Sequence, residues 1–493
     1  MGTVSPLRPR IAWVDAAKAY GIFLVFYGHF VAEVGTPASL TQQKLVYAFH
    51  MPLFILLSGC VAKSAPELPR LGPFFKRQVA SRLLPVVFFS VLMMPLFPLE
   101  KALRDYLPSK PSLLQVEWID DWPELCRRLN PSAQGELPRP GRKVWESLPA
   151  PVQGMVAKGA AGHPLEKEAQ AEIAAALNQV LSKPDLFVLE DFSGIRLSDK
   201  NRQWLSQDRL GLGENRARRH NMDCMWQGLY PEWAGQEQSY WSDWLWRAKM
   251  TLRGYTEFNL PVWFLVCLFT VELMHFAVVR FLTSRVRLGL AIPLFFAAGW
   301  WATANMELRA DLWFARESVL LYAFYLLGYL LRRTEVLERR SGWWSRWPLL
   351  VVGSTVLLLT FDLNPGSKVN EPVVLINLSQ HGDPLYFVLA AAAGCLAVVG
   401  LARLTPAARA ISFTGRHTLI LMGLNGIFYN FVNAPVVNGV NIPSVPGLLV
   451  LWCSVVTLAS LAVCMPVVWL LDRYVPQLVG RPRVQGPFLP SLA

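Results

Sequence analysis

Two histidines lie inside apolar runs near the start of the chain, and their residue type suits proton transfer. His29 ends the run that starts at Trp13, and His50 opens the run that leads to Gly59. An ionisable side chain is costly within a membrane-embedded helix, so by default it marks a functional site. Histidine also exchanges a proton near neutral pH. The pair therefore indicates acid–base chemistry inside a membrane, with a purely interhelical hydrogen-bonding role as the alternative for each histidine.

The first apolar run predicts a helix with one narrow polar stripe. At 100° per residue, Lys18 lies about −60° from Asp15, His29 about −40° and Glu33 about 0°. Such a stripe should face the interior of a bundle or a water-filled cavity. Glu33 follows His29 by one turn, so we expect it to accept a hydrogen bond from the ring and raise its basicity. Two alternatives stay open: a boundary ion pair between Asp15 and Lys18, and a solvated loop position for Glu33.

The composition is that of a polytopic membrane protein. Of the 493 residues, 53% are hydrophobic and only 17% charged, and the mean hydropathy is +0.31. Repeated apolar stretches bounded by Arg and Trp predict an all-α bundle of about ten transmembrane helices. The ten stretches cover residues 16–34, 45–62, 83–98, 261–279, 288–304, 317–331, 347–361, 384–401, 417–432 and 447–471.

The distribution of charge favours a membrane topology over a nucleic-acid partner. Residues 101–253 hold 21 Lys and Arg against 20 Asp and Glu, so nearly all of the net charge of +12 lies in the rest of the chain. With the N-terminus in the cytoplasm, alternate short segments hold 22 basic residues inside and 4 outside. This bias predicts both termini in the cytoplasm, with an uncleaved first span, in what we expect to be a bacterial inner membrane.

Residues 101–253 form an insertion between two membrane regions, 1–100 and 254–493. Its composition is that of a small soluble unit, and residues 161–181 predict a solvent-facing amphipathic helix. We expect a mostly helical extracytoplasmic domain without catalytic residues. Cys126 and Cys224 lie in it, and a disulfide and two free thiols are both compatible with the sequence. No metal-ligand spacing is present, so no metal is expected.

The two histidine runs resemble the acyltransferase-3 family, especially its fucose 4-O-acetylase-like branch. Four further segments match in the family's order, and the resemblance covers the chain outside the insertion. The matching segments are Trp13–His29, Phe49–Gly59, Lys76–Pro85, Val262–Phe269 with Trp263, Phe324–Arg333 and Thr414–Ile420. Three departures are the insertion itself, Ala19 after the Asp-x-x-Lys motif, and Asn425 where a histidine often ends the late span.

The resemblance implies transfer of an acyl group, usually acetyl, from cytoplasmic acyl-CoA to a hydroxyl of an extracytoplasmic glycan or glycolipid. It implies that His29 is essential and that Arg77 and Arg82 lie where acyl-CoA approaches; determining topology is the alternative role for both arginines. The residues suit that reaction, because a histidine within hydrogen-bond reach of the hydroxyl supplies a base. An acyl-enzyme route through His29 is also open.

The sequence therefore predicts a membrane O-acyltransferase that uses acetyl-CoA as donor. His29 is the predicted base, with Glu33 and His50 as further site residues, and Lys18, Arg77 and Arg82 as donor-binding residues. Asp15, Trp263, Arg316 and Asn425 are expected to line the site, although Arg316 has the alternative of pairing with Glu317. Two other functions stay open: a proton-coupled secondary transporter, which the lack of an internal repeat disfavours, and a non-catalytic membrane scaffold.

Overall fold

In a computed structural model of the chain, the described residues form helices joined by turns and loops, with no β-strand among them. These are residues 11–100, 114, 116, 119, 121–130, 139–183, 186–187, 221–222, 224–226, 228–230, 240–305, 312–335, 346–366, 373–440 and 445–492. The described chain divides into two compact units. One comprises residues 1–100, 247–366 and 373–493, and the other comprises residues 101–246 and 367–372.

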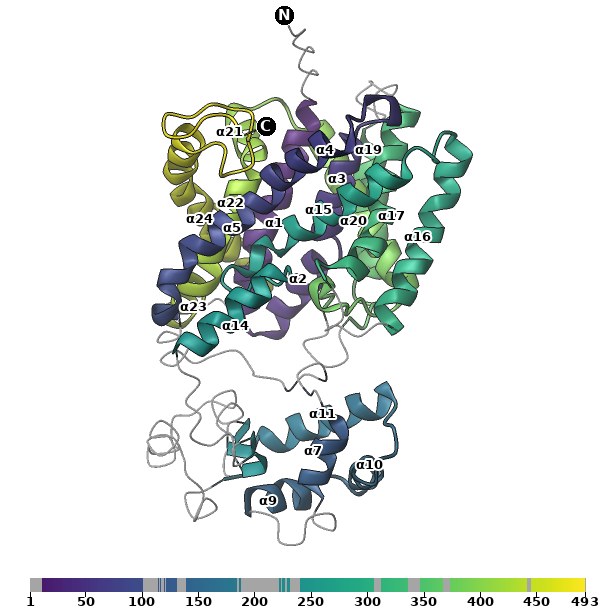
Figure 1. The fold of residues 1–493 in the computed structure, drawn as a ribbon, viewed down its shortest axis with the longest axis vertical. Coiled ribbons are helices and arrows are strands. Elements are labelled where there is room, and N and C mark those ends of the chain that lie inside the picture. Colours follow the sequence, from purple (N-terminus) through teal and green to yellow (C-terminus); the bar gives the residue numbers. More distant parts are fainter. Residues whose placement is uncertain are drawn as a thin grey trace, which may run out of the picture. The chain divides into compact units, whose positions relative to one another are not determined.

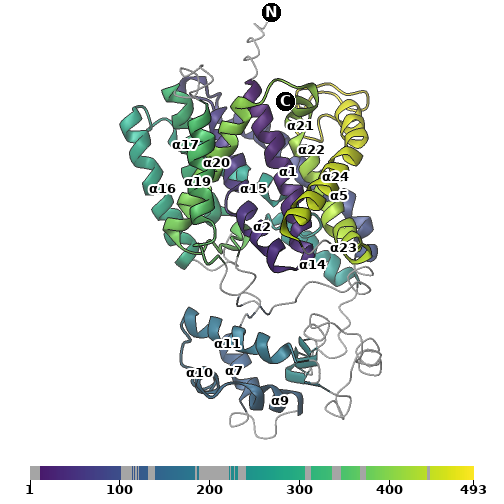
Figure 2. The same ribbon diagram turned by 180° about the vertical axis from the view of Figure 1, so that it is seen from behind.

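The larger unit is a bundle of apolar helices (Figures 1 and 2). Every one of the ten predicted stretches contains helix. The bundle helices are α1 (Ala12–Val34), α2 (Pro37–Tyr47), α3 (His50–Cys60), α4 (Leu71–Gln78), α5 (Leu84–Met93), α15 (Trp263–Val278), α16 (Arg285–Asn305), α17 (Ala315–Thr334), α19 (Trp347–Thr360), α20 (Pro384–Leu404), α21 (Arg409–Arg416), α22 (Thr418–Ile427), α23 (Asn433–Gly439) and α24 (Pro446–Tyr474).

Six helical segments of the described chain are long and apolar enough to cross a bilayer. They are Leu71–Glu100, Leu260–Val278, Arg285–Asn305, Pro384–Leu404, Thr418–Val437 and Pro446–Tyr474. Only 22% of the apolar window is buried in Arg285–Asn305, and 28% in Pro446–Tyr474. Helices this apolar and this exposed require a lipid environment, because water would penalise their outer faces. The chain is therefore an integral membrane protein.

The second predicted span is broken where a single helix was expected. Residues 45–62 were predicted to be continuous, but α2 ends at Tyr47 and α3 begins at His50. Phe49 between them leaves the helical region, with φ −144° and ψ −14°. The break has a packing reason, because the Phe49 ring lies against Gly394 of α20, where a Cβ would come within 2.2 Å of it.

Close backbone contact between α3 and α17 holds the centre of the bundle together. A Cβ at Gly59 would lie 2.0 Å from the carbonyl oxygen of Tyr325, and one at Gly328 would lie 2.0 Å from that of Leu56. Small residues at such crossings are typical of membrane bundles, where van der Waals packing drives association. The glycines of two segments that carry the family resemblance are thus required by one helix crossing.

The smaller unit has its own hydrophobic core, built from four helices among the described residues: α7 (Trp122–Leu129), α9 (Arg139–Ser147), α10 (Ala150–Ala160) and α11 (Lys167–Leu181). The predicted amphipathic helix over 161–181 starts later, at Lys167. Leu125, Leu177 and Leu181 are fully buried in this core. Cys126 and Cys224 are buried there too, and they are not joined by a disulfide. Of the two alternatives that the sequence left open, the structure thus shows the one without a disulfide.

Candidate active site

The long helix α1 carries the polar stripe that the sequence predicted. It runs without interruption from Ala12 to Val34 and ends at Gly35, whose φ of 70° favours glycine. Asp15, Lys18, His29 and Glu33 are all half-buried, whereas most of their neighbours on the helix are buried. The stripe thus occupies the partly accessible side of an otherwise enclosed helix.

His29 meets Asn425 of α22 across the bundle. The Nδ1 of His29 lies 2.5 Å from the Oδ1 of Asn425. An amide oxygen only accepts, so Nδ1 carries the proton and donates it. Nε2 of a neutral ring is then left as the basic nitrogen. Asn425 is fully buried, and it provides an orienting contact to the His29 ring. The predicted role of Glu33 stays a prediction.

The ring of Tyr47 packs near both His50 and His29. The ring centroids of Tyr47 and His50 are 5.0 Å apart, and those of Tyr47 and His29 are 6.5 Å apart. His50 is buried, and its Nδ1 donates to the Val46 carbonyl at 2.9 Å. The break between α2 and α3 therefore places His50, as well as Tyr47, beside the first-span histidine.

Two π-helical segments interrupt the bundle next to candidate site residues. Phe428–Val432 follows α22 directly, and its Tyr429 ring lies 5.3 Å from the His29 ring. Val79–Leu83 separates α4 from α5 and contains Arg82. Insertions of this kind widen a helical turn and are frequent at functional sites. Each π-helical segment thus contains a polar candidate residue, Tyr429 in the first and Arg82 in the second.

Asn259 and Phe89 fix the position of α22, and with it Asn425. The side-chain amide of Asn259 donates to the Gly423 carbonyl at 2.9 Å. A Cβ at Gly426 would come within 2.4 Å of the Asn259 side chain, and one at Gly423 within 2.4 Å of the Phe89 ring. Glycines on both sides of Asn425 thus allow the close packing that holds its amide against His29.

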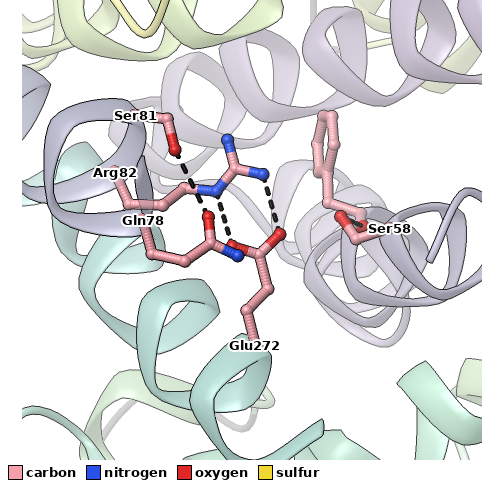
Figure 3. A network of polar contacts seen from close by, with 6 residues as sticks. Ser58, Gln78, Ser81, Arg82 and Glu272 are labelled. Carbon is pink, nitrogen blue, oxygen red and sulfur yellow. Dashed lines mark hydrogen bonds and ion pairs between the residues drawn. The ribbon is translucent and has the colours of Figure 1, made fainter. Parts of the chain in front are cut away.

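Arg82 forms a bidentate ion pair with Glu272 of α15 (Figure 3). Its Nε and Nη2 donate to the two carboxylate oxygens at 3.0 and 2.8 Å. The neighbouring Ser81 donates to Gln78 at 3.4 Å. A planar fork of this kind fixes the guanidinium group strongly. Arg82 is thus held by the protein itself, while Arg77, one turn earlier, is half-buried beside it.

Trp263 and Arg316, which were also predicted to line the site, have partners on other helices and loops. Trp263 is buried against the rings of Phe264 and Phe314. Arg316 donates to Glu317 at 3.2 Å and to Ser379 at 2.7 Å, and both charged side chains are almost fully buried. The alternative reading of Arg316, in which it pairs with Glu317, is therefore observed.

His381 lies in the same loop as Ser379 and is buried. Its ring packs against Trp300 and Phe387. Burial, together with the nearby Arg316 guanidinium, lowers the pKa of His381 to about 4. The histidine therefore stays neutral at physiological pH.

Several polar residues near the site were missed by the sequence reasoning. Glu272 and His275 both lie in the apolar run of α15, and His275 contacts Tyr322 and the Lys63 carbonyl at 3.3 and 3.2 Å. Like His29, both are ionisable side chains within an apolar stretch, and such side chains indicate a functional site in a membrane helix. Tyr47 and Tyr429 gave no such signal, since aromatic residues are common throughout membrane helices.

Comparison with known protein families gives a match to the first part of the chain. Residues 11–123 match the model of the family Acyl_transf_3, described as an acyltransferase domain. The match contains His29, His50, Arg77 and Arg82. No curated protein and no solved structure gives a significant match. Residues 11–123 thus resemble the acyltransferase-3 family, and this match supports a membrane acyltransferase; the fucose 4-O-acetylase-like branch stays a prediction.

Proposed function

We propose that this acyltransferase moves an acyl group, usually acetyl, from cytoplasmic acyl-CoA to a hydroxyl of an extracytoplasmic glycan or glycolipid, with His29 as the base. The observation that carries the proposal is the contact between His29 and Asn425. It fixes the tautomer in which Nε2 accepts a proton, and it comes from a helix that the family match does not cover. Donor and acceptor would thus meet at one half-buried ring within the lipid bilayer.

The proposed reaction is a direct transfer between thioester and alcohol. Nε2 of His29 takes the proton of the acceptor hydroxyl as its oxygen attacks the thioester carbonyl. The new C–O bond forms, the C–S bond breaks, and the proton passes to the departing sulfur, so the products are an ester and free CoA. The Asn425 oxygen stabilises the imidazolium form that exists between the two proton transfers.

His50 and Tyr47 have supporting positions in this proposal. The Nδ1 of His50 is held by the Val46 carbonyl, so its Nε2 is the nitrogen left to contact a substrate.

Lys18 and Arg77 are the proposed donor-binding residues, Lys18 on the polar stripe of α1 and Arg77 on α4. Arg82 acts indirectly, because its guanidinium group is already bound to Glu272 and holds the π-helical segment in place.

The test is transfer of labelled acetyl from acetyl-CoA in membranes that contain the full chain. We expect His29→Gln to lower the rate at least 100-fold at equal protein level, because a general base contributes roughly 10²–10⁴-fold. His163→Gln is the matched control, since His163 is exposed in the inserted unit and should transfer at the wild-type rate. Equal rates for the two variants would remove His29 from the mechanism.

Acceptor class is tested separately. Mass spectrometry of surface glycans and glycolipids from cells with the wild-type chain should show an added acetyl mass that cells with His29→Gln lack. An acetylated product found instead on proteins or peptides would overturn the glycan acceptor while leaving the transfer chemistry intact.

A further inference from the structure

The C-terminal segment after α24 folds back onto the bundle beside Arg82. Val479 is buried in the main hydrophobic core. Gly480 follows with a φ of 91°, and a Cβ there would lie 2.7 Å from the Leu419 side chain and 3.4 Å from the Ser81 carbonyl oxygen. Ser81 directly precedes Arg82 in the π-helical segment. Figures 1 and 2 show this segment, in yellow, next to α21.

An ion-pair cluster fixes the segment at Arg481. Its guanidinium group contacts Asp472 at 2.6 Å and the Nε2 of His417 at 3.1 Å. His417 also contacts Asp472 at 3.2 Å, and its Nδ1 donates to the Phe413 carbonyl at 2.7 Å. The amide of Leu492 donates to the Pro482 carbonyl at 2.7 Å, so the chain is held on both sides of Arg483.

Arg483 is exposed and extends from this fixed segment into electrostatic range of Arg77. The carboxylates nearby are already engaged, Asp472 with Arg481 and Glu272 with Arg82. Four guanidinium groups therefore share two carboxylates. Arg77 thus lies within electrostatic range of both Arg483 and Arg82, and Glu272, the carboxylate that also acts on it, is already paired with Arg82. An anion would relieve this surplus of positive charge.

We propose that Arg483 and Arg77 together bind the phosphate groups of the acyl-CoA donor, so that the C-terminal segment completes the donor site. The proposal rests on the function proposed above. Guanidinium groups bind phosphate oxygens through paired, charge-assisted hydrogen bonds, and coenzyme A carries a pyrophosphate and a 3′-phosphate. The headgroup of an anionic lipid offers the same chemistry, so the experiment has to separate the two sources.

The test measures binding of unacylated coenzyme A and of pantetheine, which lacks phosphate, to the purified full-length protein in nanodiscs of zwitterionic lipid. Arg483→Gln should weaken coenzyme A binding about tenfold, which corresponds to about 1.4 kcal/mol, and leave pantetheine binding unchanged. Arg473→Gln is the matched control. Arg473 is an exposed arginine of the last turn of α24 that lies over the rings of Trp469 and Tyr474, and its replacement should change neither affinity.

Three outcomes would overturn this inference. They are equal coenzyme A affinity in the Arg483→Gln and Arg473→Gln variants, a parallel loss of pantetheine binding, and an effect of Arg483→Gln that appears only when anionic lipid is added. The last result would assign the two arginines to the membrane surface. These experiments measure binding and not turnover, so their results are independent of the His29 test. If Arg483→Gln leaves the affinity for coenzyme A unchanged while the wild-type protein still transfers acetyl, only the role of Arg483 is overturned and the proposed reaction stands.

Discussion

The contact between His29 and Asn425 joins residues that are 396 positions apart in the chain. An imidazole that exchanges protons with a substrate needs one fixed tautomer, since a ring free to present either nitrogen spends part of its time with the wrong one towards the substrate. Asn425 satisfies this need with a neutral oxygen. A carboxylate in its place would hold the imidazolium more strongly, as charged acceptors do.

Replacement of Asn425 should separate catalysis from donor binding. Asn425→Leu removes the hydrogen-bond acceptor and should lower kcat roughly 10- to 100-fold. A hydrogen bond to a charged group contributes about 1.5–3 kcal/mol, and its loss in the transition state lowers the rate by about that factor. The KM for acetyl-CoA should stay the same, because Asn425 contacts the base and not the donor. Steady-state kinetics of labelled acetyl transfer measures both constants.

Asn425→Asp is the conservative control, since it keeps an acceptor oxygen at the same position. It should retain more activity than Asn425→Leu. Equal losses in kcat for the two variants would show that the amide supports the fold of α22 and does not orient the base.

At the scale of elements, the site depends on helices that approach one another more closely than side chains normally permit. The crossing of α3 and α17 at Gly59 and Gly328 leaves no room for a methyl group on either helix. The α2–α3 break has a similar origin, because Phe49 packs against a glycine of α20. Both features position His50, which begins α3 directly after Phe49.

Gly328→Ala should therefore destabilise the protein by about 1–3 kcal/mol, the usual cost of overpacking a close contact. The matched control is Gly289→Ala in α16, where a Cβ meets open space. The control should be neutral or stabilising by up to about 1 kcal/mol, because alanine favours helix over glycine. Denaturant unfolding of both variants in the same detergent gives the comparison. A Gly328→Ala variant as stable as the control would show that the α3–α17 crossing relaxes at no cost.

At the scale of the whole molecule, the chain combines a lipid-embedded bundle with a unit that has a separate core. Burial raises the pKa of the Cys126 thiol in that second core to about 11, above the ordinary value of about 8.5. The folded unit thus holds a proton that the unfolded chain releases at lower pH. Its stabilising effect is complete below about pH 8.5 and is lost as the pH rises towards 11.

Two measurements check this prediction. The free energy of unfolding of the inserted unit should decrease from about pH 8.5 to about 11, and Cys126→Ala should flatten that decrease. At pH 8 the thiol should react with iodoacetamide only after denaturation, because the reactive species is the thiolate. Peptide mapping by mass spectrometry distinguishes Cys126 from the other cysteines. Alkylation of Cys126 in the folded chain at the rate of a free cysteine would contradict the buried position.

Much of this architecture was predictable from the sequence because a bilayer allows few solutions. A backbone in hydrocarbon must satisfy its own hydrogen bonds, so each apolar stretch becomes helix, and an imidazole within such a stretch stands out by its cost. Hence the all-α class and the helical stretches followed from local pattern, and the structure confirms both. The role of His29 stays a prediction.

Tertiary structure alone decided which polar groups meet. Apolar periodicity gives no information about which helices are neighbours, so the partners Asn425 for His29 and Glu272 for Arg82 appear only when the bundle is assembled. The same holds for Gly59 and Gly328, whose need for glycine comes from the backbone of another helix. Local sequence specifies helices because each backbone hydrogen bond joins residues four positions apart. The site instead joins residues hundreds of positions apart, through packing between helices that no single segment encodes.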